Sequence, residues 1–220
     1  MGARPAARVI GAMAVEEVQA TMVELGFALD GDALPRAHRG ALAQALERAL
    51  PWLAALPGVA VHQLKLPAGS GPEAPLSRRT RLRLRVPRAH ADSAAELQGR
   101  ELRLGAHRLR IGACEQRELL PHGTLYAHCV SIDDAADSDE AVFLRSVQTE
   151  LAALGVAGRA ICGRAQHDEE AGVSGFSLML DGLSREDSLR ILEAGLGRHR
   201  RLGCGVFVPH RSAAAVGTPA

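Results

Sequence analysis

Apolar and polar positions along the first half of the chain predict strands interrupted by two helices. Over 18–29, Val23, Leu25, Phe27 and Leu29 alternate with polar or small neighbours, which is the period of a strand. The further elements expected in this half are a helix over 38–54, strands over 59–66 and 80–86, a short helix over 91–97, and a hairpin over 101–104 and 108–111. The order β-α-β-β-α-β is the ferredoxin-like arrangement.

The same order of elements recurs in the second half. The pattern predicts a strand over 125–132, a helix over 137–154, a hairpin over 159–166 and 173–180, a helix beginning at Ser184, and a last strand over 206–208. Each unit can bury one face of an antiparallel sheet beneath its two helices. We therefore predict an α+β protein with two tandem ferredoxin-like domains, over residues 15–116 and 117–212.

The strand predicted over 80–86 has an unusual polar face. Thr80, Leu82, Leu84 and Val86 alternate with arginines, which places all the arginines on one side; these are Arg79, Arg81, Arg83 and Arg85. Guanidinium groups spaced about 6.5 to 7 Å apart repel one another unless acids or an anion lie across them. Two explanations stay open: a neighbouring strand that supplies acids, with Glu101 or Glu115 as the source, or the backbone of a nucleic acid.

A glycine-rich segment with a basic cluster follows the last predicted helix. Its glycines are Gly195, Gly197, Gly203 and Gly205, and they flank Arg198, His199, Arg200 and Arg201. Glycines allow positive φ and close backbone approach, so such a loop can bind a phosphate group. Because the helix reaches this loop by its C-terminal end, the arginines would have to supply the attraction. The alternative is a plain helix-to-strand connection with solvated arginines.

Composition narrows the class of protein. With 220 residues, 47% of them hydrophobic, the chain can bury a substantial core, and no apolar run approaches the roughly 18 to 20 residues of a membrane span. The net charge is +1, yet Lys65 is the single lysine, so the positive charge lies almost wholly on arginines. Four scattered cysteines form no C-x-x-C pair. We expect a cytoplasmic protein with no metal site and no cofactor.

The tandem order and the glycine-rich loop resemble the repeat-associated mysterious protein (RAMP) superfamily of CRISPR systems. Within it, the chain resembles the Cas-six type of endoribonuclease, in its myxobacterial-type subtype. The matching motifs are Leu34-Pro35-Arg36-Ala37-His38-Arg39-Gly40-Ala41-Leu42, the arginine strand from Ser77 to Arg85, and the segment from Gly105 to Gly112. The resemblance spans residues 18–209. It departs at Ala37 and Ala41, where the subtype leads us to expect an acid and a tyrosine beside the histidine.

The resemblance implies metal-independent cleavage within the repeat of precursor CRISPR RNA. The 2′-hydroxyl of the RNA attacks the adjacent phosphate and leaves 2′,3′-cyclic phosphate and 5′-hydroxyl ends. We expect His38 to act as the general base, between Arg36 and Arg39, and His199 is its rival. His38 could instead be an ordinary exposed histidine at a helix entry. His62 and His128 fall in strand patterns and are expected to be half-buried.

We expect the RNA to contact both basic regions. The predicted contacts are Arg36, Arg39, Arg79, Arg81, Arg83, Arg85, Arg198, Arg200 and Arg201, with Gly195, Gly197, Gly203 and Gly205. The partners implied are repeat RNA, as precursor and as mature guide, and other Cas subunits of a Cascade-type complex. Two other functions stay open: a non-catalytic guide-RNA-binding subunit of the same superfamily, and a ferredoxin-like protein that binds a small anion.

Overall fold

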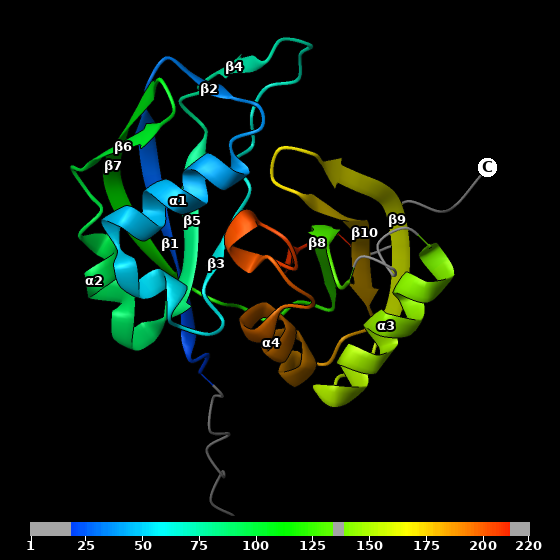
Figure 1. The fold of residues 1–220 in the computed structure, drawn as a ribbon. Coiled ribbons are helices and arrows are strands. Elements are labelled where there is room, and N and C mark those ends of the chain that lie inside the picture. The colour runs from blue at the N-terminus through cyan, green and yellow to red at the C-terminus, as the bar shows by residue number, and fades with distance from the viewer. Residues whose placement is uncertain (1–18, 134–138, 212–220) are drawn as a thin grey trace, which may run out of the picture.

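The computed structural model describes residues 19–133 and 139–211, and it folds as two α+β halves that lie side by side (Figure 1). Parts of four sequence predictions therefore lie outside the described residues. They are the start of the first domain at 15–18, the first residue of the strand predicted over 18–29, the start of the helix predicted over 137–154, and residue 212 at the end of the second domain.

The N-terminal half is a five-stranded antiparallel sheet with two helices on one face. Its strands are β1 (Met22–Asp30), β3 (Ala60–Val61), β5 (Arg81–Pro87), β6 (Glu101–Leu104) and β7 (His107–Glu118), and its helices are α1 (Arg39–Ala49) and α2 (Ala91–Ala95). The spatial order is β3-β5-β1-β7-β6. β6 forms a hairpin with β7 and extends the sheet at that edge. The other four strands have the ferredoxin-like order.

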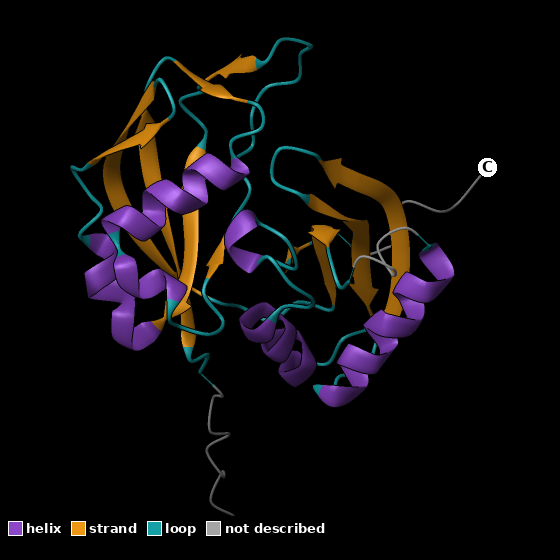
Figure 2. Ribbon diagram, in the orientation of Figure 1, coloured by secondary structure: helices purple, strands orange, loops and turns teal. Residues whose placement is uncertain are grey.

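The C-terminal half repeats the plan with a four-stranded sheet. It contains β8 (Thr124–Val130), α3 (Glu140–Ala153), β9 (Arg159–Asp168), β10 (Val173–Asp181), α4 (Arg185–Ala194) and β11 (Val208–Pro209). The order β11-β8-β10-β9 places the two central strands of the sheet, β8 and β10, side by side. Figure 2 shows α3 and α4 on the same side of this sheet. The predicted α+β class with ferredoxin-like sheets is confirmed.

Each half has its own apolar core. Val23, Leu25 and Phe27 of β1 pack beneath α1 and α2 in the first core, as their alternation predicts. The second core lies under α3 and α4 and includes Phe143 and Ile191. Ala20 and Met22, at the start of β1, and Leu119, just after β7, also belong to the second core, so the chain ties the two halves together where it enters and leaves the first sheet.

The structure corrects the extent of several predicted elements. The strand predicted over 59–66 pairs only at Ala60–Val61, where it flanks β5 as an edge strand. The His62 amide still donates to the Arg83 carbonyl oxygen at 2.9 Å, and residues 63–66 leave the sheet. The last strand, predicted over 206–208, lies at Val208–Pro209. The helix predicted to reach residue 54 ends at Ala49, ahead of Pro51 and a 3₁₀ turn, η1 (Pro51–Ala54). The predicted domain boundary at 116 falls inside β7, which continues to Glu118.

A small sheet absent from the prediction lies above the first half in Figure 1. It pairs β2 (Ala33–Pro35) with β4 (Glu73–Pro75), three residues each. Strands this short, with a proline in each, carry too few residues to show a period of two. This sheet closes the loop that leads into α1.

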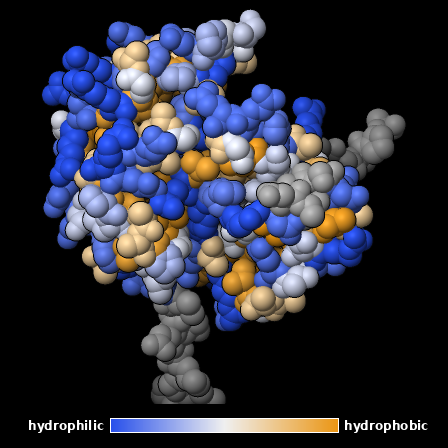
Figure 3. All heavy atoms as spheres, viewed as in Figure 1, coloured by the Kyte–Doolittle hydropathy of each residue, from blue (hydrophilic) through white to orange (hydrophobic). Residues whose placement is uncertain are grey.

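Most of the molecular face shown in Figure 3 is hydrophilic, with small hydrophobic patches between the polar side chains. Within residues 19–133 and 139–211, no helix is both long enough and apolar enough to cross a membrane.

Candidate active site

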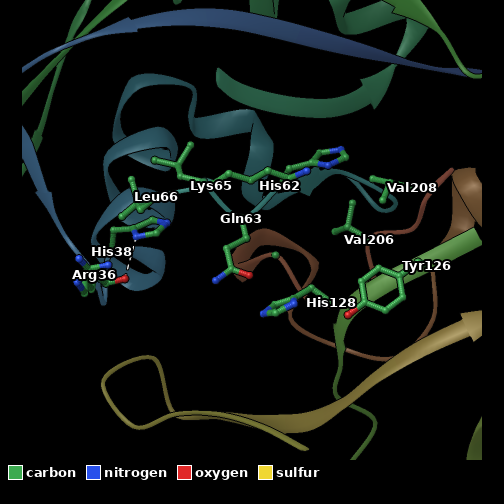
Figure 4. A pocket seen from close by; sticks show the side chains of 12 residues that line it. Arg36, His38, His62, Gln63, Lys65, Leu66, Tyr126, His128, Val206 and Val208 are labelled. Atoms are coloured by element: carbon green, nitrogen blue, oxygen red, sulfur yellow. Dashed lines mark hydrogen bonds between the residues drawn. The ribbon is translucent and has the colours of Figure 1, made fainter. Parts of the chain in front are cut away.

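A cleft of about 490 Å³ lies between the two halves. The segment that leads into α1 and the segment that leaves β3 supply one wall, and β8 with the segment before β11 supplies the other (Figure 4). The lining residues are Arg36, His38, His62, Gln63, Leu64, Lys65 and Leu66 from the N-terminal half, and Tyr126, His128, Gly203, Val206 and Val208 from the C-terminal half. The cleft thus exists only where the halves meet.

His38 occupies the N-cap position of α1, where the chain turns into the helix. Its side chain is only 2% exposed, so the alternative of an ordinary exposed histidine is wrong. Its Nδ1 lies 2.9 Å from the carbonyl oxygen of Arg36 and 3.2 Å from that of Pro35. Carbonyl oxygens accept hydrogen bonds, so the ring proton lies on Nδ1. In the neutral ring, Nε2 therefore carries the free lone pair.

The environment of His38 favours this neutral form. Burial lowers the pKa of the imidazole, the two backbone carbonyls oppose that shift, and the Arg39 cation lowers the pKa further. Nε2 is closed off from bulk water and has no hydrogen-bond partner among the described residues. A neutral imidazole with an uncommitted nitrogen is the state that a general base requires.

Other polar groups in the cleft were missed or misplaced by the sequence prediction. Lys65, the single lysine, is exposed and lines the cleft together with half-buried Gln63. His128 is exposed and not half-buried, because it points away from the second core, and His62 is fully buried. Tyr126 carries one available signal, since it alternates with Leu125 and Ala127 and so faces away from the core.

The cleft continues into two smaller hollows. One, of about 250 Å³, shares His62, Gln63, Lys65 and Val208 with the cleft, and Arg79, Arg81 and Arg83 line its other side. A second, of about 140 Å³, shares Gln63 and His128 with the cleft and is also lined by Asp168. The cleft and the two hollows form a continuous groove along the seam between the halves, and one end of this groove is basic.

The arginines on one face of the β5 region divide into two groups. Arg79 and Arg81 are exposed, and the Arg83 side chain is 43% exposed. Arg85 is only 1% exposed, so its predicted contact with RNA is wrong. Its Nη2 lies 3.1 Å from Oε2 of Glu24 and donates to the Phe207 carbonyl oxygen at 3.0 Å. The acid beside Arg85 therefore comes from β1, and neither Glu101 nor Glu115 supplies it.

Glu24 is the centre of a buried charged cluster beside the cleft. Its carboxylate lies 3.0 Å from Nε2 of His62 and 3.7 Å from Nη1 of Arg83, in addition to Arg85. Burial opposes ionisation of this carboxyl group, but His62, Arg85 and Arg83 outweigh burial and lower its pKa to about 2. Glu24 therefore stays ionised and holds the arginine strand to the segment that leaves β3.

Arg36 and Arg39 flank His38 but contact different parts of the structure. Arg36 donates from Nη1 to the Pro67 carbonyl oxygen at 2.7 Å and from Nε to that of Gly71 at 2.8 Å, and it still lines the cleft. Arg39 is 7% exposed, and its Nε lies 3.3 Å from Oδ2 of Asp168 at the end of β9. This pair joins the two halves and lines the hollow of about 140 Å³, so the predicted contact of Arg39 with RNA stays a prediction.

The glycines of the C-terminal loop are required for backbone packing. Gly195, Gly197, Gly203 and Gly205 all have positive φ. A Cβ at Gly205 would lie 1.8 Å from the Leu196 carbonyl oxygen, and one at Gly197 would lie 2.2 Å from that of Ser131. Gly195 and Gly205 are buried, which contradicts their predicted phosphate contacts, whereas Gly203 lines the cleft and its contact stays a prediction. The amide of Gly197 is already bound by the carboxylate of Glu150, at 2.7 Å.

The basic residues within this loop differ in accessibility. All three guanidinium nitrogens of Arg200 are shielded from solvent, and burial, aided by the charge of Arg85, lowers its pKa to about 10. Its predicted RNA contact is therefore wrong. Arg201 forms an ion pair with Glu47 of α1 and remains partly exposed. Arg198 and His199 are exposed, and His199, with φ of 61°, is not among the residues that line the cleft.

The carboxylate, thiol and imidazole groups are dispersed over the structure. In the part of the chain that the structure describes, no three His, Cys, Asp or Glu side chains lie close enough together to hold a metal ion.

Comparison with known proteins relates the chain to one family. The model of the Cas6 CRISPR family matches residues 23–212. The CRISPR-associated endonuclease Cas6 of Myxococcus xanthus strain DK1622 is 36% identical over 196 residues, which cover 88% of this chain and 84% of that protein.

Solved structures are similar in fold at low sequence identity. A CRISPR-associated protein Cas6 superposes with a TM-score of 0.56 at 12% identity, over 88% of this chain and all of that one. A Cas6-related protein from Pyrococcus furiosus gives 0.56 at 10% identity, covering 85% and 98% of the two chains. A RAMP protein described as binding different RNA substrates gives 0.54 at 14% identity, covering 84% and 98%.

Proposed function

The chain belongs to the Cas6 family, and from this premise we propose that it is a metal-independent endoribonuclease that cleaves precursor CRISPR RNA within the repeat. The observation that carries the proposal is His38. Its ring is fixed by two carbonyl oxygens at Nδ1, and its Nε2 is uncommitted at the edge of the cleft between the halves.

In the proposed reaction, Nε2 of His38 removes the proton from a 2′-hydroxyl of the RNA. The freed oxygen attacks the adjacent phosphorus, and the bond to the 5′-oxygen of the next nucleotide breaks. The products are a 2′,3′-cyclic phosphate and a 5′-hydroxyl. Such a reaction requires positioning, a base and positive charge near the reacting phosphate, and His38 supplies the base.

Lys65 supplies the positive charge in this proposal. It lines the same cleft as His38, and its ammonium group has three donors that can stabilise the charge on the phosphorane oxygens. It can also return a proton to the departing 5′-oxygen. Among the described residues, no three carboxylate, thiol or imidazole groups lie close enough together to hold a metal ion. The proposed reaction therefore uses proton transfer and the positive charge of side chains.

The groove suggests how a longer RNA is held. Arg79, Arg81 and Arg83 line the hollow that adjoins the cleft beyond Lys65, so a strand with its scissile phosphate near His38 can place further phosphates against them. A single small anion does not need this length of basic groove, which argues against the small-anion alternative. The uncommitted Nε2 of His38 in turn favours an enzyme over a guide-RNA-binding subunit without catalysis.

Cleavage by the purified protein tests the proposal directly. Its own repeat RNA is incubated with an excess of protein, with and without EDTA, and the product ends are identified by mass spectrometry. We expect equal rates in both conditions and 2′,3′-cyclic phosphate ends. A requirement for added Mg²⁺, or products that end in a 3′-hydroxyl, would contradict the proposal.

A further inference from the structure

The helix-free face of the C-terminal sheet carries an unbroken row of half-exposed apolar side chains. The register pairs Val208 of β11 with Tyr126 of β8, Tyr126 with Met179 of β10, and Met179 with Ile161 of β9. All four are half-buried. The row therefore crosses all four strands of the sheet, on the face opposite α3 and α4.

Tyr126 is the aromatic residue of this row, and the composition of the chain makes it distinctive. The chain has four phenylalanines, one tryptophan and one tyrosine. All four phenylalanines are buried. Trp52 lies in η1 of the N-terminal half, where it packs against His90. Tyr126 is thus the one Phe, Tyr or Trp side chain among those that line the cleft.

The ring of Tyr126 has a second aromatic ring beside it. The ring of His210 lies with its centroid 5.4 Å away, tilted by 43°. Figure 4 shows the Tyr126 ring directed into the cleft on the wall opposite His38. A ring that packs against a second ring and also lines a groove can serve as a stacking platform.

We propose that Tyr126, supported by His210, stacks against an unpaired base of the repeat RNA next to the scissile phosphate. This inference rests on the function proposed above. Proteins that recognise single-stranded RNA stack its bases on aromatic rings, and every base offers a face for this contact. The occupant is RNA because the row continues into the cleft at Tyr126 and Val208, and because the arginine-lined hollow begins at Val208.

The first test measures affinity for repeat RNA made uncleavable by a 2′-deoxy substitution at the attacking nucleotide. Tyr126→Leu keeps an apolar side chain on the sheet but removes the aromatic ring, and we expect it to weaken binding by about 5- to 150-fold, the range for loss of one stacked base. Tyr126→Phe keeps the ring and should bind within about twofold of the unmodified protein. The matched control is Leu120→Ala, since the Leu120 side chain is 64% exposed and lies outside the row.

The second test locates the base. Single abasic sites are placed in turn along the same RNA. One position should weaken binding to the unmodified protein as much as Tyr126→Leu does, and should cost the Tyr126→Leu protein nothing further. Because this is a binding measurement, the platform can be confirmed or overturned even if the protein fails to cleave.

Three outcomes overturn the inference. If Tyr126→Phe loses as much affinity as Tyr126→Leu, the hydroxyl group and not the ring makes the contact. If every abasic site weakens both proteins equally, no base stacks on Tyr126. If Tyr126→Leu leaves RNA affinity unchanged but converts a dimer to a monomer in sedimentation, the row is covered by a second copy of the chain.

Discussion

Arg85 of β5 donates a hydrogen bond from Nη1 to the carbonyl oxygen of Leu192 in α4, at 2.6 Å. The bond crosses from the N-terminal sheet to a helix of the C-terminal half. With the contacts of Arg85 to Phe207 and Glu24, it makes this arginine a structural link across the seam that forms the cleft. Arg81 and Arg83, nearer the start of the same strand, and Arg79, in the turn before it, line the groove.

Replacing Arg85 with alanine should destabilise the protein strongly. The substitution leaves Glu24 buried without its closest guanidinium partner and leaves two carbonyl oxygens unpaired. Loss of one partner from a buried ion pair costs about 3 to 5 kcal/mol of unfolding free energy. Urea denaturation measures this. Arg79→Ala, at an exposed position in the turn before β5, is the control and should change the free energy of unfolding by no more than about 0.5 kcal/mol.

The charged cluster also predicts how stability depends on pH. The pKa of Glu24 is about 2 in the folded protein and 4.5 as an isolated group. A lowered folded pKa gives stability that is fully present well above pH 4.5 and is lost as the pH falls through 4.5 toward 2. The full contribution of this group is about 3 kcal/mol.

Glu24→Gln isolates this contribution. Free energies of unfolding are measured in urea at pH 6, 5, 4 and 3 for the unmodified protein and the variant. The unmodified protein should lose more stability than the variant over this range, and the difference should appear mainly below pH 5. Parallel losses in the two proteins would show that Glu24 is not ionised against its neighbours.

Salt dependence should identify the arginines that contact RNA. Each phosphate contact to a single strand contributes about 0.7 to the slope of log K against log salt. Arg81→Ala with Arg83→Ala should therefore reduce the slope by roughly 1.4. Arg108→Ala with Arg110→Ala is the matched control, because both are exposed, two residues apart on β7, and outside the cleft and the hollow. Equal slopes in the two double variants would remove the arginine-lined hollow from the RNA path.

Substitution of a glycine in the glycine-rich loop should destabilise the folded protein. Gly205 has φ of 63°, and a Cβ there would lie 1.8 Å from the Leu196 carbonyl oxygen. Gly205→Ala should therefore cost more than about 3 kcal/mol or prevent folding, since backbone must move to admit it. Gly99, with φ of 84° and open space around its Cβ position, is the control. Gly99→Ala should cost only about 1 to 2 kcal/mol. Equal thermal stability of the two variants would contradict the packing role.

Strands with one face on a core could be predicted from the sequence. Alternation in β1 and β5 reflects a real division between core and surface, so the two strands lie close to their expected positions. The same alternation over 59–66 misled the prediction. Only Ala60 and Val61 pair with β5 as a strand, and residues 62–66, all of which line the cleft, continue without a partner strand.

The candidate site could be predicted only in part. The motif around His38 predicted this histidine as the general base. Its burial and the carbonyl contacts at Nδ1 depend on the loop closed by β2 and β4, which was not predicted. Arg83 and Arg85 are equivalent in a period of two. Only the docking of α4 and Phe207 separates the exposed arginine from the buried one. The wall that holds Tyr126 and His128 comes from a different half, and no local pattern specifies how the halves meet.

The cleavage rate of His38→Ala with repeat RNA under single-turnover conditions tests the central claim most directly. A positioned general base contributes about 10²- to 10⁴-fold to the rate, so the account predicts a loss in this range with the affinity for uncleavable RNA unchanged. His199→Ala is the matched control and should cleave at the unmodified rate. A His38→Ala protein that keeps more than about a third of the unmodified rate, or a comparable loss in His199→Ala, would contradict the account.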